Sequence, residues 1–220
     1  KGSTLLIDKG ATIRFTGKQR IRCEGQLNCF GTSSDMIYFT SNDVNDIESL
    51  RSWLGVDLNG NGVLSWVRFN NATDAITVKS ASLTLSHCQF ENISSVGIFL
   101  TQECQFEIAN SHFFKSRFGI SVESISEGTV RHNLFYDLQF NDESVGVTNN
   151  ACEVAISDNC FYDCSKGMSI VYGGVGDVMH NYISNCDIGI YNFTFEREAI
   201  YTLTKNTVEN CAQHLIEMHH

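Results

Sequence analysis

The segment His132-Asn-Leu-Phe-Tyr-Asp137 returns twice, slightly altered, further along the chain. Asp158-Asn-Cys-Phe-Tyr-Asp-Cys164 begins 26 residues later, and His180-Asn-Tyr-Ile-Ser-Asn-Cys186 begins 22 residues after that. In each copy an Asn lies two residues before an apolar residue, which we call the anchor. A motif that returns at a nearly constant interval indicates an internal structural repeat.

The repeat extends well beyond these three copies. Successive anchors are separated by 21, 23, 22, 26, 22 and 25 residues, and they are Phe69, Phe90, Phe113, Phe135, Phe161, Ile183 and Val208. A period of about 20–26 residues with short strands is typical of one coil of a β-solenoid. About six residues after most anchors a Gly precedes an aliphatic residue, which we interpret as a tight bend into the next strand. The pairs are Gly97-Ile98, Gly119-Ile120, Gly146-Val147, Gly167-Met168 and Gly189-Ile190.

Alternating side chains divide each coil into three short strands. In one coil the strands are expected near Val154–Ser157, Cys160–Tyr162 and Gly167–Val171. Strand alternation directs every second side chain inward, and no segment keeps the 3.6-residue period of a helix. The predicted inward residues of this coil are Val154, Ile156, Asn159, Phe161, Met168 and Ile170.

The Asn residues of the repeat are expected to form a ladder. Stacked coils place equivalent residues about 4.8 Å apart, so their amide groups can bond to one another along the stack. The predicted ladder consists of Asn133, Asn159, Asn181 and Asn206.

The Asn-x-[Phe/Ile] and Gly-Ile repeats resemble those of the pectin-lyase-like superfamily of right-handed parallel β-helix repeat proteins. The N-terminal segments Thr12–Phe15, Gly25–Gly31 and Met36–Ser41 resemble the opening coils of such proteins. We therefore predict an all-β chain, a right-handed parallel β-helix of about eight coils with three short strands each. One domain would span residues 1–220, with atypical coils over 1–60, an acidic loop at 42–52 and regular coils over 61–218. The superfamily includes lyases, hydrolases, epimerases, adhesins and stalks, so the resemblance predicts a fold rather than one function.

Charge and hydropathy narrow the range of partners. The formal net charge is −10, and phosphate neutralisation needs clustered Lys and Arg, so we expect no nucleic-acid partner. No apolar run is long enough for a membrane span, so no membrane insertion is expected. The chain begins at Lys1 without Met, which suggests a piece of a longer protein. Open coil ends favour flanking domains or self-association.

The nine cysteines follow the repeat. Cys164, Cys186 and Cys211 occupy one inward column on successive coils, where Cys acts as a small apolar residue. We predict buried thiols, with one disulfide between adjacent coils as an alternative. Evenly stacked Cys do not form a tetrahedron, so no metal site is predicted. No cofactor is expected, except calcium if the protein is a lyase.

Three outward columns are candidates for function. The first carries the aromatic residues Phe114, Tyr136 and Tyr162, with Tyr182 nearby. Flat rings with a polar tip suit the faces of sugars. A covering loop or partner chain, or simple reinforcement of the sheet, is the alternative explanation.

The second column places His132, Asp158 and His180 on successive coils, with Arg131 adjacent. A carboxylate between two imidazoles can orient one of them as a general base, and an Arg can hold an anionic substrate. The column adjoins a tight turn, where polar residues are expected in any case.

The third column follows the Gly-Ile strand and contains the aromatic residues Phe99 and Tyr191. In enzymes of the resembled superfamily this face lines the substrate cleft, and a lyase would show clustered carboxylates for calcium beside a basic residue. Among the residues assigned to this face, only Glu123 and Lys79 are charged, two coils apart. This departure argues against catalysis.

We weigh three functions. The first is a carbohydrate-binding or surface-display module of a secreted or cell-surface protein, with a polysaccharide partner. The second is a polysaccharide lyase, hydrolase or epimerase. The third is an intracellular protein-interaction scaffold, which nine reduced cysteines would suit.

Overall fold

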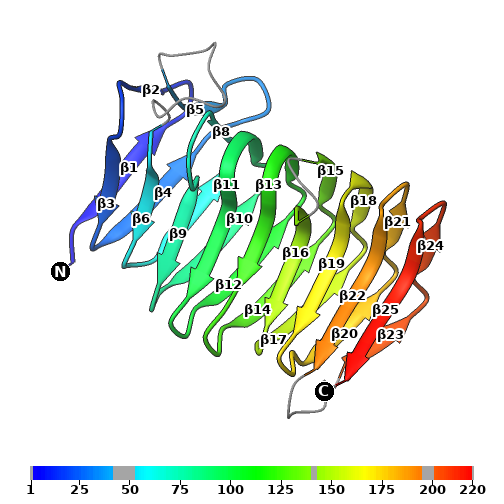
Figure 1. Cartoon of the computed structure of the whole chain (residues 1–220). Coiled ribbons are helices and arrows are strands. Elements are labelled where there is room, and N and C mark those ends of the chain that lie inside the picture. Colours follow the sequence, from blue (N-terminus) through cyan, green and yellow to red (C-terminus); the bar gives the residue numbers. More distant parts are fainter. Residues whose placement is uncertain (1, 42–52, 140–142, 195–200, 220) are drawn as a thin grey trace.

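The chain winds into a solenoid whose colour in Figure 1 runs steadily from the N-terminus to the C-terminus. The computed structural model describes residues 2–41, 53–139, 143–194 and 201–219, so the predicted acidic loop at 42–52 lies outside the described residues. Within the described part, each coil contributes one strand to each of three parallel ladders of nine rungs. Nine rungs span eight turns from first to last, which confirms a β-helix of about eight coils.

The strands of each ladder lie in chain order. The first ladder contains β1 (Thr4–Asp8), β4 (Gln26–Phe30), β7 (Gly62–Ser65), β10 (Ser82–Ser86), β12 (Gln105–Ala109), β14 (Glu127–Arg131), β17 (Glu153–Ser157), β20 (Gly176–Met179) and β23 (Tyr201–Thr204). The second contains β2 (Thr12–Phe15), β5 (Ile37–Ser41), β8 (Val67–Asn70), the first halves of β11 (Gln89–Thr101) and β13 (His112–Val122), then β15 (Leu134–Leu138), β18 (Cys160–Cys164), β21 (Tyr182–Ser184) and β24 (Thr207–Glu209). The third contains β3 (Arg20–Cys23), β6 (Gly55–Leu58), β9 (Ile76–Lys79), the second halves of β11 and β13, then β16 (Val145–Asn150), β19 (Lys166–Val171), β22 (Ile188–Thr194) and β25 (Gln213–His219).

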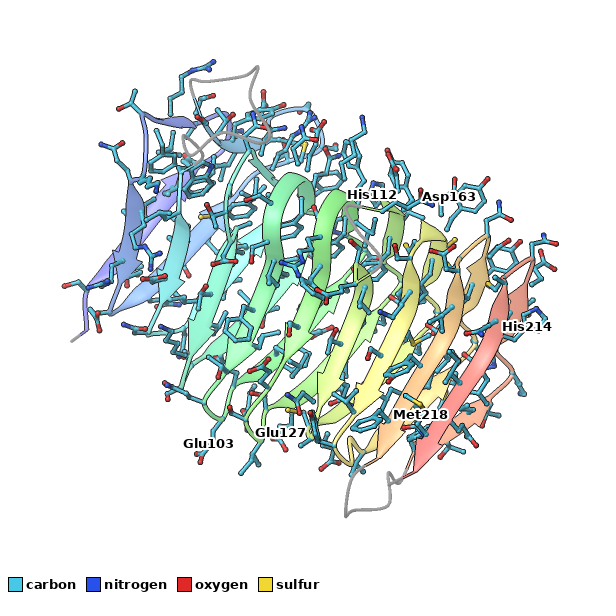
Figure 2. The ribbon with its side chains drawn as sticks, in the orientation of Figure 1. Glu103, His112, Glu127, Asp163, His214 and Met218 are labelled. Atoms are coloured by element: carbon cyan, nitrogen blue, oxygen red, sulfur yellow. The ribbon has the colours of Figure 1, made fainter. Side chains whose placement is uncertain are left out.

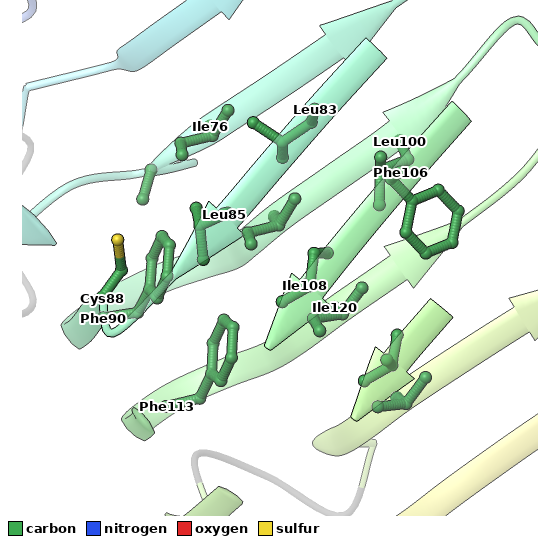
Figure 3. Close-up of a cluster of buried hydrophobic side chains, with 14 of the residues drawn as sticks. Ile76, Leu83, Leu85, Cys88, Phe90, Leu100, Phe106, Ile108, Phe113 and Ile120 are labelled. Atoms are coloured by element: carbon green, nitrogen blue, oxygen red, sulfur yellow. The ribbon is translucent and has the colours of Figure 1, made fainter. Parts of the chain in front are cut away.

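The five Phe anchors, from Phe69 to Phe161, form a continuous stack of rings in the core. Phe90 pairs in register with Phe113, and their rings lie face to face with centroids 4.6 Å apart (Figure 3). Phe135 and Phe161 continue the stack at 4.8 and 4.7 Å. All five side chains are fully buried. The rung spacing of a parallel sheet matches the separation of stacked aromatic rings, so one Phe per coil fills the interior without gaps.

The predicted Asn ladder is present. The Asn159 Oδ1 accepts hydrogen bonds from the Asn133 backbone N–H (2.9 Å) and from Asn133 Nδ2 (3.1 Å). Its Nδ2 donates to the Val130 carbonyl (2.9 Å) and to Asn181 Oδ1 (3.0 Å). The side chain therefore satisfies backbone groups at a bend where no strand partner is available.

The residues at the corners between ladders adopt the left-handed backbone conformation. They have φ near +55°, a conformation that Asn and Asp tolerate better than most side chains. One corner column precedes the second ladder and another follows it. The first consists of Trp66, His87, Asn110, His132, Asp158, His180 and Lys205, and the second of Asn71, Asn92, Lys115, Asp137, Asp163, Asn185 and Asn210.

The repeated Gly has a different role from the predicted one. None of the five Gly of the Gly-aliphatic pairs has a positive φ, so the expectation that they provide bends is wrong. A Cβ at Gly146 would lie 2.6 Å from the Gly167 carbonyl oxygen and 2.6 Å from the Phe161 ring. The column is Gly because the next coil and the anchor ring leave no room for a side chain.

The cysteines pack as the inward column predicted. Cys164 and Cys186 are buried in the core, whereas Cys211 on the last rung is half-exposed. All nine cysteines are free thiols. A hydrogen bond between the two buried thiols raises the pKa of Cys164 and lowers the pKa of Cys186.

Candidate functional site

The outer face of the second ladder carries an apolar surface, which we call the aromatic strip. The strands here are short, so each rung presents only two outward side chains between its corners. The residue after the anchor and the residue before it supply the strip, which consists of Phe114, Leu134, Tyr136, Cys160, Tyr162 and Tyr182.

The strip brings together all four aromatic residues predicted for the first column. Phe114 pairs in register with Tyr136, and their rings stack with centroids 5.1 Å apart. Tyr136 pairs with Tyr162 on the next rung. Tyr162 and Tyr182 each expose 41% of their surface, a large fraction for aromatic side chains. The register places Tyr182 beside Cys160, in the neighbouring column.

Two groups in the strip have altered acidities. The Tyr182 hydroxyl donates a hydrogen bond to Glu209 Oε1, and this bond raises the pKa of Tyr182. Burial raises the pKa of the Cys160 thiol, which therefore stays neutral on this face. The strip thus presents hydroxyl, thiol and ring surface rather than charge.

Polar corner residues form the two rims of the strip. On one rim His132, Asp158 and His180 follow one another on successive corners, as the sequence predicted. His180 Nδ1 lies 4.0 Å from Asp158 Oδ1. On the other rim Asp137 follows Tyr136 and Asp163 follows Tyr162. In Figure 2, Asp163 and His112 project from the same edge of the solenoid.

Arg131 is not part of that rim. It ends β14 in the first ladder, and its guanidinium forms an ion pair with Glu107 on the preceding rung. The two side chains are close to half exposed. Glu107 therefore already binds the guanidinium that the sequence analysis assigned to an anionic substrate.

The third ladder separates its two predicted aromatic residues. Phe99 and Tyr191 belong to one column in register, but Ser121, Thr148 and Ser169 lie between them. Three rungs therefore separate the rings, and neither ring adjoins the aromatic strip. The face between them carries small hydroxyl side chains.

The charge of this third face was underestimated. Lys79 and Glu123 lie two rungs apart, as predicted. They are not the only charged residues of the face, because Asp57 pairs with Thr77 and extends the column of Phe99 one rung toward the N-terminus, before the residues assigned from the sequence. Asp57 is buried between Arg20 Nη1 (2.7 Å) and Arg22 Nε (3.6 Å). The alternation of Val56 and Leu58 inward with Asp57 outward was the signal in the sequence that could have located it.

The first ladder has a hollow on its outer face that the sequence did not predict. Its volume is about 390 Å³, and Phe106, Gly128 and Gly176 are among its lining residues. The exposed carboxylates Glu127, Glu153 and Asp177 also line it. A Cβ at Gly128 would lie 2.7 Å from the Phe106 ring, so this ring occupies the space beside the glycine.

Neither a metal centre nor a membrane segment is found in the described part of the chain. No group of three or more His, Cys, Asp or Glu side chains there could hold a metal ion. The same residues contain no helix of the length and apolarity that crossing a membrane requires.

Comparison with known proteins identifies the family. Residues 27–188 match the family described as the right-handed beta helix region. The chain belongs to the right-handed β-helix family. The match covers well over half of the chain and agrees with the pectin-lyase-like fold that the repeat predicted.

One solved structure shows a weak similarity to this β-helix protein. An alginate lyase from Paenibacillus sp. str. FPU-7 aligns over 94% of this chain and 92% of its own, with 12% sequence identity and a TM-score of 0.40. No curated protein matches the chain.

Proposed function

We propose that this β-helix protein is a carbohydrate-binding module whose ligand lies along the aromatic strip. The observation that supports this most strongly is the register of Phe114, Tyr136 and Tyr162 on three consecutive rungs. Phe114 and Tyr136 stack on each other, so their ring edges and the exposed surface of Tyr162 form the apolar surface against which the C–H faces of a repeating sugar chain can pack. The polar rims provide hydrogen bonds for the hydroxyl groups at the edges of each sugar.

Exposure supports a binding role over simple reinforcement of the sheet. Tyr162 and Tyr182 leave much of each ring in water, and at Tyr162 the core of the same rung already holds the stacked anchor ring of Phe161. Contiguous apolar surface rimmed by polar residues marks interaction sites in soluble proteins. A secreted or cell-surface setting, where polysaccharides are plentiful, is part of this proposal.

The test compares two double variants, each of which lacks two aromatic rings. In the Tyr136→Ala/Tyr162→Ala variant, binding on an array of neutral, basic and acidic glycans should fall by about 10–100-fold, as expected for two hot-spot rings at about 1–2 kcal/mol each. The Phe99→Ala/Tyr191→Ala variant removes two rings from the third ladder and should bind like the wild type. Circular dichroism verifies that both variants keep their fold.

Equal loss in the two variants would place the ligand elsewhere and contradict the proposal. Absence of glycan binding by the wild type would do so too, and would favour the scaffold alternative, with the strip as a protein contact.

A separate activity assay tests the lyase alternative. Arg20, Arg22 and Asp57 bring one carboxylate and two basic groups together on the third face, and calcium is the cofactor that the resemblance implies for a lyase. Incubation with polyuronates and calcium, followed by ultraviolet absorbance, detects unsaturated uronide products. Product that depends on Arg22 would make the third face catalytic.

A further inference from the structure

The rims of the aromatic strip carry more negative than positive charge. Four carboxylates lie around its tyrosines: two on one rim, one on the other rim, and one on the last rung in the column that follows the anchors. Two ammonium groups lie toward its ends. The carboxylates are Asp137, Asp158, Asp163 and Glu209, and the ammonium groups are Lys115 and Lys205. These six groups carry a net charge of about −2, which has the same sign as the net charge of −10 of the whole chain.

The strip already holds one cation of its own. The Lys115 Nζ lies 5.8 Å from the centroid of the Phe114 ring, within the range of a cation–π contact. In the described part of the chain no cation lies over the rings of Tyr136, Tyr162 or Tyr182. Tyr136 has one face against the Phe114 ring, whereas the exposed ring surface of Tyr162 and Tyr182 is available to an external ammonium group. A Tyr face attracts a cation as a Phe face does.

We propose that the strip selects a basic glycan, a polymer of amino sugars with free ammonium groups, over neutral and acidic ones. This inference rests on the carbohydrate-binding function proposed above and names its ligand class. A sugar would place its C–H face against the exposed surface of Tyr162 or Tyr182 and its ammonium group toward a rim carboxylate. The carboxylates of a polyuronate would instead meet Asp137 and Asp163, where like charges repel.

The corner geometry provides a clean way to remove the charge. Asp137 and Asp163 occupy left-handed corners, and Asn occupies the same column at Asn185 and Asn210. An Asp137→Asn/Asp163→Asn variant therefore keeps a residue type that this conformation accepts. The matched control is Glu153→Gln/Asp177→Asn, which removes the same net charge from the exposed outer face of the first ladder.

The probes are three β-linked hexasaccharides, one of glucosamine, one of N-acetylglucosamine and one of a uronic acid, at a pH where amines are protonated and carboxylates ionised. Titration calorimetry at low ionic strength should show the glucosamine hexamer binding about tenfold more tightly than the neutral one, since exposed ion pairs are individually weak. Added salt should reduce this advantage. The uronic acid hexamer should bind most weakly.

The two variants distinguish attraction by the rim carboxylates from attraction by the net charge of the whole protein. Asp137→Asn/Asp163→Asn should lower glucosamine binding about five- to tenfold and N-acetylglucosamine binding much less, because Asn can still hydrogen-bond sugar hydroxyls but carries no charge. The control variant should keep the preference for glucosamine. Equal losses in both variants would overturn the inference, because the attraction would then come from net charge alone. A lysine hexapeptide that binds as tightly as the glucosamine hexamer would also overturn it, because the strip would then recognise any polycation.

Failure of this inference differs from failure of the proposed function. Tyrosine-dependent binding of the neutral hexamer with no preference for the basic one would refute the charge selection and keep the carbohydrate module. Absence of tyrosine-dependent binding to any hexamer would refute both.

Discussion

At the scale of single residues, close approach between coils determines which side chains are possible. Gly146 is the clearest case, because a Cβ there would meet a backbone oxygen and an aromatic ring at 2.6 Å. We expect Gly146→Ala to lower the free energy of unfolding by about 1–3 kcal/mol, the usual cost of overpacking a core. Urea unfolding measures this, with Ser157→Ala on the outer side of the next coil as a control. An unchanged midpoint would mean that Phe161 and the neighbouring strand move aside easily.

At the scale of elements, the Asn ladder joins the first strand of each coil to the second. Replacing Asn159 by Ala leaves the Asn133 backbone N–H and the Val130 carbonyl without their partners, both in the buried interior. We expect a loss of about 2–4 kcal/mol in unfolding free energy, since each unpaired buried group costs about 1–3 kcal/mol. Asn206→Ala, at the half-buried end of the ladder, should cost less because water can reach the exposed partners. Equal costs at the two positions would show that the ladder is hydrated along its length.

At the scale of the whole molecule, the buried thiols make stability depend on pH. Burial raises the pKa of Cys29 and of Cys88 from 9.0 to about 12. Both thiols are neutral in the folded state, so their contribution is complete below about pH 9 and is lost as pH rises toward 12. We expect the free energy of unfolding to fall by about 2 kcal/mol per thiol between about pH 8 and about pH 10.5, and Cys29→Ala/Cys88→Ser to remove part of this fall. Urea midpoints at the two pH values measure it, and an equal fall in the variant would assign the effect to other groups.

Across the whole molecule, the sequence repeat predicts those features that recur in every coil. The anchors and the Asn ladder were predictable because each coil imposes the same requirement on Phe135, Phe161 and Asn159, so the pattern recurs. The role of Gly146 was misinterpreted because the atoms that exclude a side chain there belong to the next coil, and the sequence around Gly146 does not reveal them. Asp57 was missed because the early coils lack the anchor motif that set the register elsewhere. The aromatic strip was predicted as a column, but its acidic rim requires knowing that the corners are left-handed and face outward.

The direction of the backbone hydrogen bonds has a mechanical consequence. In all three ladders the strands run across the solenoid, so their hydrogen bonds point along its long axis (Figure 1). A pull along that axis loads one coil against the next, and the rungs separate one at a time, each at a modest force. A pull across the axis loads the covalent chain and all the bonds of a ladder in shear together. The molecule is therefore stiff against transverse load and yields by stepwise extension along its length.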